Sequence, residues 1–287
     1  MRKKIGFLGP EGTYCEEAGT KYLKGLAKTR LTPYSTIHQL LLAANRGKIE
    51  EAVVPVENSI EGTVGIVMDM LVKEVNLKIK REIIIPIAHN LIAPRGTKLY
   101  QVTDVISHPQ AIDQCKDYLR KKLPKANLHL AYSTADAVKQ VATSIGEKIL
   151  GRISGHHPLF AAVGTRAAAK LYGLSIIATK INASQNQTRF LVLSKSDYRR
   201  TGRDKTSIVF SVGRDRPGGL HNILGEFASR AINLTKIESR PAKKDLGDYY
   251  FFIDMEGHRE DNVIKEALNF IKKKVSFLKI LGSYPKA

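Results

Sequence analysis

The sequence predicts an α/β protein made of a large two-lobed unit followed by a small unit of different pattern. Up to about residue 195, short β-like runs alternate with helical patterns, which is typical of helices packed on sheets. A polar, unpatterned stretch, SDYRRTGRDK, then separates this region from a strand, helix, strand, strand, helix, strand order. With 287 residues, the chain is long enough for two domains that each have a core.

The large unit contains two similar series of elements, assigned from apolar runs and helical spacing. The first series has strands at 4–8, 31–35, 52–56 and 79–88 and helices at 14–26, 36–45 and 63–73. The second has strands at 105–107, 128–132, 161–163 and 175–178, helices at 111–122, 134–143 and 165–172, and a returning strand at 189–194. Thr36 and Gln39 have the spacing of a capping box. The distant returning strand predicts two lobes joined by crossing segments, with a cleft between them.

The small unit follows a linker, which divides the chain into 1–195, 196–205 and 206–287. Its expected strands are 207–213, 233–239, 249–255 and 277–282, and its expected helices are 219–228 and 262–271. This βαββαβ order predicts a ferredoxin-like domain.

Composition excludes several classes of protein. An apolar fraction of 43% and a charged fraction of 25% are those of a soluble folded protein. Two cysteines, Cys15 and Cys115, are too few for a disulfide framework and favour a reduced setting. The N-terminal apolar stretch is too short for a signal peptide, and the longest apolar region, 83–93, is too short to cross a membrane. We therefore expect a cytoplasmic protein without a membrane partner.

The net charge of +19 does not predict nucleic-acid binding. A nucleic-acid site would gather basic residues with interleaved aromatic ones, whereas the 46 lysines and arginines here are spread along the chain. Such a charge can attract an anionic substrate, and the sequence leaves its origin open.

Polar segments at the ends of apolar runs indicate the functional site, because open α/β sheets bind ligands at such strand ends. Glu57-Asn58-Ser59 closes one run, and Thr188-Arg189-Phe190 opens another. Together with the segments 9–13 and 107–110, they predict one cleft built from four distant loops. Its hydroxyls, amides and single arginine suit an anionic small molecule.

Each of these motifs also has a structural explanation. The segment 9–13 is a common glycine turn, although such turns also present N–H groups to anions. Glu57 can be merely solvated, and His108 stands at a helix start. Ser133 is first a helix cap, and Arg189 can be an exposed strand start. We expect no metal site, because His156-His157 lacks further ligands at suitable spacing, and no nucleotide cofactor, because neither GxGxxG nor GK[ST] occurs.

Taken in series, the motifs resemble those of the prephenate dehydratase family, in that family's order. They are Gly9-Pro10-Glu11-Gly12-Thr13, Val54 to Ser59, Ser107 to Ala111, Ser133-Thr134-Ala135, Ala167-Ala168 with Tyr172-Gly173-Leu174, and Asn186 to Phe190. Residues 206–285 resemble the ACT regulatory domain, with Arg216-Pro217-Gly218 and Glu238-Ser239-Arg240-Pro241 as markers. The resemblance covers nearly the whole chain.

The resemblance implies a two-lobed catalytic domain like type II periplasmic binding proteins, and a carbon–oxygen lyase that converts prephenate to phenylpyruvate in phenylalanine synthesis without a cofactor. The family's essential threonine maps to Thr188. The implied substrate-binding residues are Thr13, Asn58, Ser59, Ser107, Gln114, Ser133 and Arg189. The family also implies self-association, as a dimer or tetramer, with L-phenylalanine bound between ACT domains. The implied effector residues are Gly219, Leu220, Asn222 and Ser239.

Two departures and two alternatives stay open. The segment 181–184 lacks an aspartate that often precedes the threonine motif. The usual Gly-Ala-Leu-Val motif reads Gly218-Gly219-Leu220-His221, so the strength and identity of the effector are open. Arogenate dehydratase is one alternative function. A non-catalytic sensor of an amino acid or aromatic acid is the other.

Overall fold

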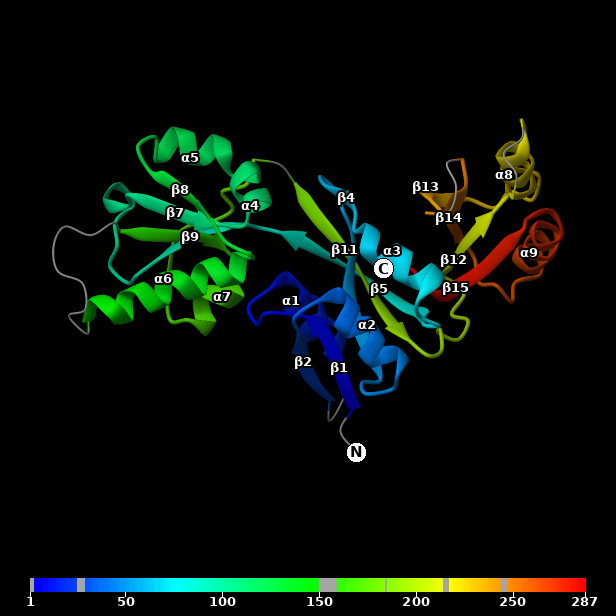
Figure 1. Cartoon of the computed structure of the whole chain (residues 1–287), viewed down its shortest axis with the longest axis horizontal. Coiled ribbons are helices and arrows are strands. Elements are labelled where there is room, and N and C mark those ends of the chain that lie inside the picture. Colours follow the sequence, from blue (N-terminus) through cyan, green and yellow to red (C-terminus); the bar gives the residue numbers. More distant parts are fainter. Residues whose placement is uncertain (1–2, 25–28, 150–158, 184, 214–216, 244–246) are drawn as a thin grey trace.

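The computed structural model describes residues 3–24, 29–149, 159–183, 185–213, 217–243 and 247–287. Within these residues three sheets lie in a row along the long axis of the molecule (Figure 1). The sheet that contains the N-terminal strand lies in the middle, so it contacts both of the other units.

The central sheet belongs to the first lobe. Its strands are β1 (Lys3–Leu8), β2 (Thr29–Tyr34), β3 (Glu51–Asn58), β4 (Gly62–Thr63), β5 (Lys78–Ile87) and β11 (Asn186–Ser194), in the order β2-β1-β3-β11-β5 with β4 beside β3. Its helices are α1 (Tyr14–Leu23), α2 (Ile37–Asn45) and α3 (Gly65–Lys73). The side chain of Thr36 accepts a hydrogen bond from the Gln39 amide and so caps α2 as predicted. Strand β11 is antiparallel to both neighbours, which places its start beside the end of β3.

The second lobe is built on a separate sheet with the order β10-β6-β9-β7-β8. Its strands are β6 (Asn90–Ala93), β7 (Asp104–Ser107), β8 (Asn127–Leu130), β9 (Phe160–Gly164) and β10 (Ser175–Ala178). Its helices are α4 (Pro109–Gln114), α5 (Lys116–Lys122), α6 (Thr134–Ile149) and α7 (Arg166–Leu171), preceded by a short 3-10 turn, η1 (Leu99–Gln101). The chain crosses between the lobes twice, from β5 into β6 through Ala88-His89 and from β10 back to β11.

The third unit is a four-stranded antiparallel sheet with the order β13-β14-β12-β15. Its elements are β12 (Asp204–Ser211), α8 (Gly219–Ser229), β13 (Leu234–Pro241), β14 (Tyr249–Glu256), α9 (Asn262–Lys274) and β15 (Phe277–Pro285). Helices α8 and α9 pack on one face of this sheet. The other face packs on the first lobe.

The third unit shares a hydrophobic core with the first lobe. Leu191 and Leu193 of β11 belong to the same buried cluster as Phe252 of β14 and Leu281 of β15. Gly282 lies at φ 153°, and a Cβ there would stand 2.4 Å from the carbonyl oxygen of Ile79 on β5. The two backbones therefore approach so closely at this point that only glycine fits.

The predicted fold class is confirmed: two α/β lobes are followed by a βαββαβ domain. The prediction of one continuous helix at 111–122 is wrong, because two helices, α4 and α5, lie on either side of Cys115. Strand β6 was not predicted, since it lies within the continuous apolar run 83–93. The domain division at 195 and 206 stays a prediction; β11 ends at Ser194 and β12 begins at Asp204. Among the described helices, none is long and apolar enough to cross a membrane.

Candidate active site

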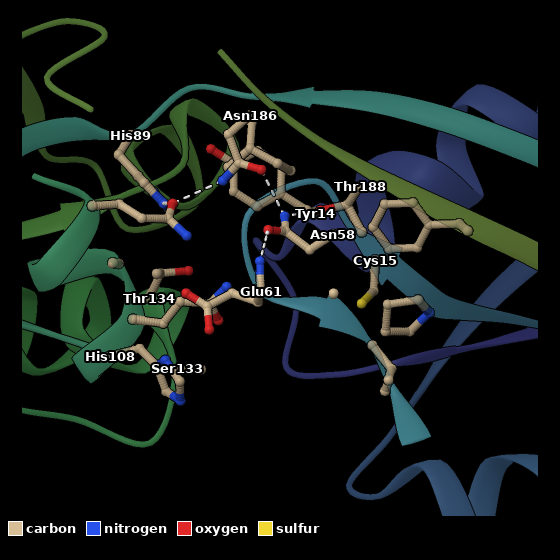
Figure 2. Close-up of a pocket in the computed structure, with 18 of the residues that line it drawn as sticks. Tyr14, Cys15, Asn58, Glu61, His89, His108, Ser133, Thr134, Asn186 and Thr188 are labelled. Atoms are coloured by element: carbon tan, nitrogen blue, oxygen red, sulfur yellow. Dashed lines mark hydrogen bonds between the residues drawn. The ribbon is translucent and has the colours of Figure 1, made fainter. Parts of the chain in front are cut away.

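The two strands with polar ends are direct neighbours. Thr188 of β11 is the cross-strand partner of Asn58, the last residue of β3. Along β11, the side chains of Asn186, Thr188 and Phe190 point to one face, because successive residues of a strand alternate between faces. All three line a cavity of about 350 Å³ between the two lobes (Figure 2).

Both lobes contribute polar side chains to this cavity. The first lobe supplies Tyr14 from the start of α1 and Asn58 from β3, and the second supplies Gln114 from α4. Ser133 and Thr134 line it at the N-terminal end of α6, where the Ser133 Oγ accepts a hydrogen bond from the Asp136 amide. The positive end of that helix dipole therefore lies at the cavity.

The backbone fixes the amide of Asn58. Its Oδ1 accepts hydrogen bonds from the N–H groups of Ile60 (3.0 Å) and Glu61 (3.1 Å). Its Nδ2 must then be the donor to Thr188 Oγ1, at 2.9 Å, and to Asn186 Oδ1, at 2.7 Å. The Thr188 hydroxyl accepts from Asn58, so its own proton stays available for another acceptor.

The same hydrogen-bond chain continues across the two lobes. Asn186 Nδ2 donates to Gln114 Oε1 at 2.8 Å, and His89 Nε2 lies 3.2 Å from that same oxygen. Gln114 Nε2 is buried and has no partner among the described residues. This amide group is therefore a donor that can serve a ligand in the cavity.

Burial controls the ionisation of the site. His89 is 5% exposed, and burial lowers the pKa of its imidazole below the usual value. Burial raises the pKa of the Cys15 thiol to about 12, so this lining residue stays protonated. Burial also raises the pKa of Tyr14. The neutral forms of these groups are favoured, which keeps the cavity wall largely uncharged.

Four residues predicted to contact substrate, Thr13, Ser107, Ser59 and Arg189, do not line the cavity, and the structure gives each a structural contact instead. Thr13 caps α1, because its Oγ1 accepts from the Glu16 amide and donates to the Pro10 carbonyl. Ser107 is fully buried and donates to the carbonyl of Val163.

Ser59, the third of these residues, is exposed, and its Oγ accepts from the Gln187 amide. Of the predicted contacts, Asn58, Gln114, Ser133 and Thr188 do lie together around the cavity.

Arg189, a predicted substrate contact, does not line the cavity. Strand alternation turns Arg189 to the face opposite Thr188, toward the third unit. Its Nε lies 2.8 Å from Glu82, its Nη1 2.6 Å from Asp254, and its Nη2 donates to the hydroxyl of Tyr284 at 2.8 Å. Arg189, whose side chain is 15% exposed, thus links β11 to the sheet of the third unit. The period-two pattern of β11 was the signal that could have shown this.

Sequence reasoning did not assign a role to three polar lining residues, Tyr14, His89 and Asn186. Asn186 has the same alternation phase as Thr188, so the strand pattern could have found it. His89 follows a long β-branched run, and no sequence signal shows that the chain crosses between lobes at this residue.

The predicted effector residues do not meet in one cavity of the single chain. Gly219 and Asn222 line a separate cavity of about 350 Å³ together with Phe270 and Lys274 of α9. Leu220 packs against the core of the third unit. Ser239 is exposed on β13, the edge strand of the sheet.

Metal ligands do not gather in the described part of the chain, where no three His, Cys, Asp or Glu side chains lie together. His156 and His157, which were considered as metal ligands, lie outside the described residues.

Family models match both parts of the chain. The prephenate dehydratase model matches residues 5–198, and the ACT domain model matches residues 206–272. The chain is 41% identical to a bifunctional chorismate mutase/prephenate dehydratase of Aquifex aeolicus, over 99% of this chain and 74% of that protein. It is 37% identical to a prephenate dehydratase of Methanocaldococcus jannaschii, over 99% of each.

Two solved structures resemble the whole molecule. One is a prephenate dehydratase of Arthrobacter aurescens in complex with L-Phe, with a TM-score of 0.87 and 33% identity over 99% of this chain and 90% of that one. The other is described as a quorum-quenching acylase, with a TM-score of 0.84 and 26% identity over 99% and 98%.

The ion pairs of Arg189 lead to a prediction about stability. Arg189→Met leaves the carboxylate of Asp254 without its ion pair, while Lys205 still pairs with Glu82 at 2.9 Å, so we expect the free energy of unfolding to fall by about 3 kcal/mol. Urea unfolding followed by circular dichroism measures this. The control is Lys116→Met, which removes an exposed ion pair with Asp113 and should cost less than about 0.5 kcal/mol. Equal losses in both variants would contradict the role of Arg189 as a link between β11 and the third unit.

Proposed function

The chain belongs to the prephenate dehydratase family, and we propose that Thr188 donates a hydrogen bond to the hydroxyl group that leaves prephenate. Its reaction is the decarboxylating dehydration of prephenate to phenylpyruvate, and an ACT domain follows the dehydratase domain. The supporting observation is the bond from Asn58 Nδ2 to Thr188 Oγ1, which leaves the Thr188 proton free.

The chemistry requires little beyond positioning and proton supply. Prephenate loses one carboxylate as carbon dioxide, the electron pair of the broken carbon–carbon bond enters the ring, and the ring hydroxyl leaves. The departing oxygen takes up a proton and becomes water, so one proton is consumed per turnover. Because an aromatic ring forms, the reaction is downhill and needs no electron sink.

A hydrogen bond, rather than free proton transfer, suits the acidity of Thr188. An alcohol is a weak acid, so the proton moves late or in concert with departure of the hydroxyl. Positioned proton donation contributes about 10²–10⁴-fold to rate, and a preorganised donor in a closed cleft contributes a comparable amount. The Asn58 bond orients the Thr188 oxygen before substrate arrives.

The carboxylates of prephenate would be held by neutral donors. Gln114 Nε2 has a free donor, and Ser133 lies at the start of α6, where the helix dipole favours anions. Because Gln114 and Ser133 come from the second lobe and Thr188 from the first, closing the lobes would bring the donors together and exclude water.

Regulation by L-phenylalanine at the ACT domain, with self-association through that domain in the cytoplasm, belongs to the same proposal. The effector signal would reach the cavity through β4. Thr63 lines the cavity and donates to Glu238 of β13 at 2.6 Å. Lys236 of the same strand lies 3.1 Å from Thr63 Oγ1 and 3.1 Å from the Glu57 carboxylate.

The alternative functions can be distinguished by comparing reaction rates on different substrates. Arogenate carries an amino group where prephenate carries a keto group, and the rates on the two compounds identify the physiological one. Acylase activity should be assayed beside them, because one structural relative is described as a quorum-quenching acylase. Binding of prephenate without phenylpyruvate formation would instead support a sensor.

The role of Thr188 predicts a loss of turnover with an intact fold. Thr188→Ala should lower kcat by at least about 10²-fold, because the proton donor is gone. Thr188→Ser keeps a hydroxyl and should retain much more activity than the alanine variant. Phenylpyruvate absorbance gives the rate, and circular dichroism checks folding. Near-normal kcat in Thr188→Ala would reject the proposal.

The direction of the Asn58 hydrogen bond gives a sharper test. Asn58→Asp preserves shape but replaces the donor by an acceptor, so Thr188 would donate its proton to the new carboxylate instead of to substrate. We expect kcat to fall by about 10²-fold. Asn76→Asp is the matched control, because it makes the same amide-to-carboxylate change at an exposed residue that does not line the cavity, and it should leave kcat nearly unchanged. A fully active aspartate variant would mean that the direction of this bond is irrelevant.

The β4 contacts predict that inhibition can be separated from effector binding. Lys236→Met removes the cation shared by Glu57 and Glu238 and should raise the phenylalanine concentration needed for half-inhibition, while calorimetry gives an unchanged Kd for phenylalanine. Lys243→Met is the matched control, because its ion pair with Asp69 crosses the same interface but Lys243 is 66% exposed. Wild-type inhibition in both variants would exclude this route.

A further inference from the structure

The cavity lining is poor in positive charge for a site that binds a dianion. Glu61 is the one carboxylate among the described lining residues, and none of them is a lysine or arginine. The helix starts at Tyr14 and Thr134 each offer a partial positive charge of about one half. On the proposed function, prephenate brings two full negative charges into this space.

Only two described lining side chains can acquire a full positive charge, His89 and His108. His108 is half-buried at the start of α4, whereas His89 is buried where the chain crosses between the lobes. A charge on His89 would therefore act through a less polar medium, where electrostatic attraction is stronger.

The hydrogen-bond chain fixes the tautomer of His89. The N–H groups of Ile60 and Glu61 set the Asn58 amide, Asn58 sets Asn186, and Asn186 Nδ2 makes Gln114 Oε1 an acceptor. His89 Nε2, which faces that oxygen at 3.2 Å, must then carry a hydrogen. The lone pair of neutral His89 is consequently on Nδ1.

His89 Nδ1 is buried and has no hydrogen-bond partner among the described residues. A buried acceptor without a donor is uncommon and costs stability, so it calls for an explanation. It is also the one ring position where the imidazole can gain a proton without breaking the bond to Gln114.

The side chains that contact His89 are uncharged, so none of them supplies a negative charge that would stabilise a protonated imidazole. Tyr14 of α1 meets its ring edge-on, with 6.0 Å between centroids, and the Tyr14 hydroxyl donates to the Ala88 carbonyl. Gln114 of α4 is neutral, and Asn182 Oδ1 accepts from the His89 backbone N–H. The other titratable groups of the cavity are Cys15, Glu61, His108 and Tyr132. Burial lowers the pKa of His89, which favours the neutral imidazole.

We propose that His89 takes up a proton from solvent at Nδ1 when prephenate binds. The resulting imidazolium supplies a full positive charge beside the bound dianion, and its Nε2–H continues to hold Gln114 in position. This inference rests on prephenate being the ligand of the cavity. It makes His89 a charge-compensating residue that acts through the interior rather than by contact with substrate.

Proton uptake makes prephenate binding depend on pH. Between the pKa of His89 in the free site and its raised value in the complex, the Kd should increase about tenfold per pH unit. Binding is then tightest on the acidic side of that window and weakens as pH rises through it. The Thr188→Ala variant allows Kd to be measured, because bound prephenate is consumed at least about 10²-fold more slowly.

The experiment is calorimetry of prephenate binding to Thr188→Ala in two buffers with different ionisation enthalpies. We expect uptake approaching about one proton per site at neutral pH. Adding His89→Gln should abolish both the uptake and the pH dependence, because an amide keeps the donor to Gln114 but has no basic nitrogen. Adding His108→Gln instead should leave both unchanged.

Heats that do not depend on the buffer would overturn the proposal, as would unchanged uptake in the His89→Gln background. His89→Asn serves as the second variant if the glutamine protein does not fold by circular dichroism. Failure of the proposed function appears separately, as a near-normal rate of phenylpyruvate formation by Thr188→Ala or as absence of prephenate binding in all variants.

Discussion

The cleft depends on the amide of Asn58, because two backbone N–H groups leave that side chain only one orientation. The orientations of the other polar groups in the hydrogen-bond chain follow from it. The Thr188 hydroxyl must accept from Asn58, Asn186 must donate to Gln114, and His89 must carry its hydrogen on Nε2. A chain of amides can normally flip as a unit, since oxygen and nitrogen occupy similar volumes. Here the N–H groups of the turn after β3 prevent such a flip. The geometry of that turn therefore determines which side-chain atoms donate hydrogen bonds and which accept them.

Strand β11 connects the cleft to the ACT domain because its two faces have different partners. One face carries Asn186, Thr188 and Phe190 into the cleft, and the other carries Arg189 into a cluster with Glu82 and Asp254. Adjacent residues of one strand cannot move independently. A shift of the ACT sheet against Arg189 would therefore move the Thr188 backbone as well.

The sequence predicted the elements and the meeting of Asn58 with Thr188 because both depend on local patterns: apolar periodicity, and polar residues at strand ends. It did not predict the side-chain directions that depend on strand register. Arg189 was assigned to the cleft from its position in a motif, although the alternation along β11 sends it away. His89 was missed because its role comes from a crossing between lobes, which no local pattern shows. Thr13 and Ser107 satisfy nearby backbone groups, and hydroxyls that do so look the same in sequence as hydroxyls that bind ligands.

The shared core limits how an effector can act. Leu191 and Leu193 of β11 pack with Phe252 and Leu281 of the ACT domain, and β15 approaches β5 so closely at Gly282 that no side chain fits. Separating these two units would expose that cluster to water, at a cost far above the few kcal/mol of a typical allosteric coupling. The effector must therefore act without detaching the ACT domain from the first lobe. The second lobe lies outside this shared core, so its closure over the cleft is the motion that an effector can change at low cost.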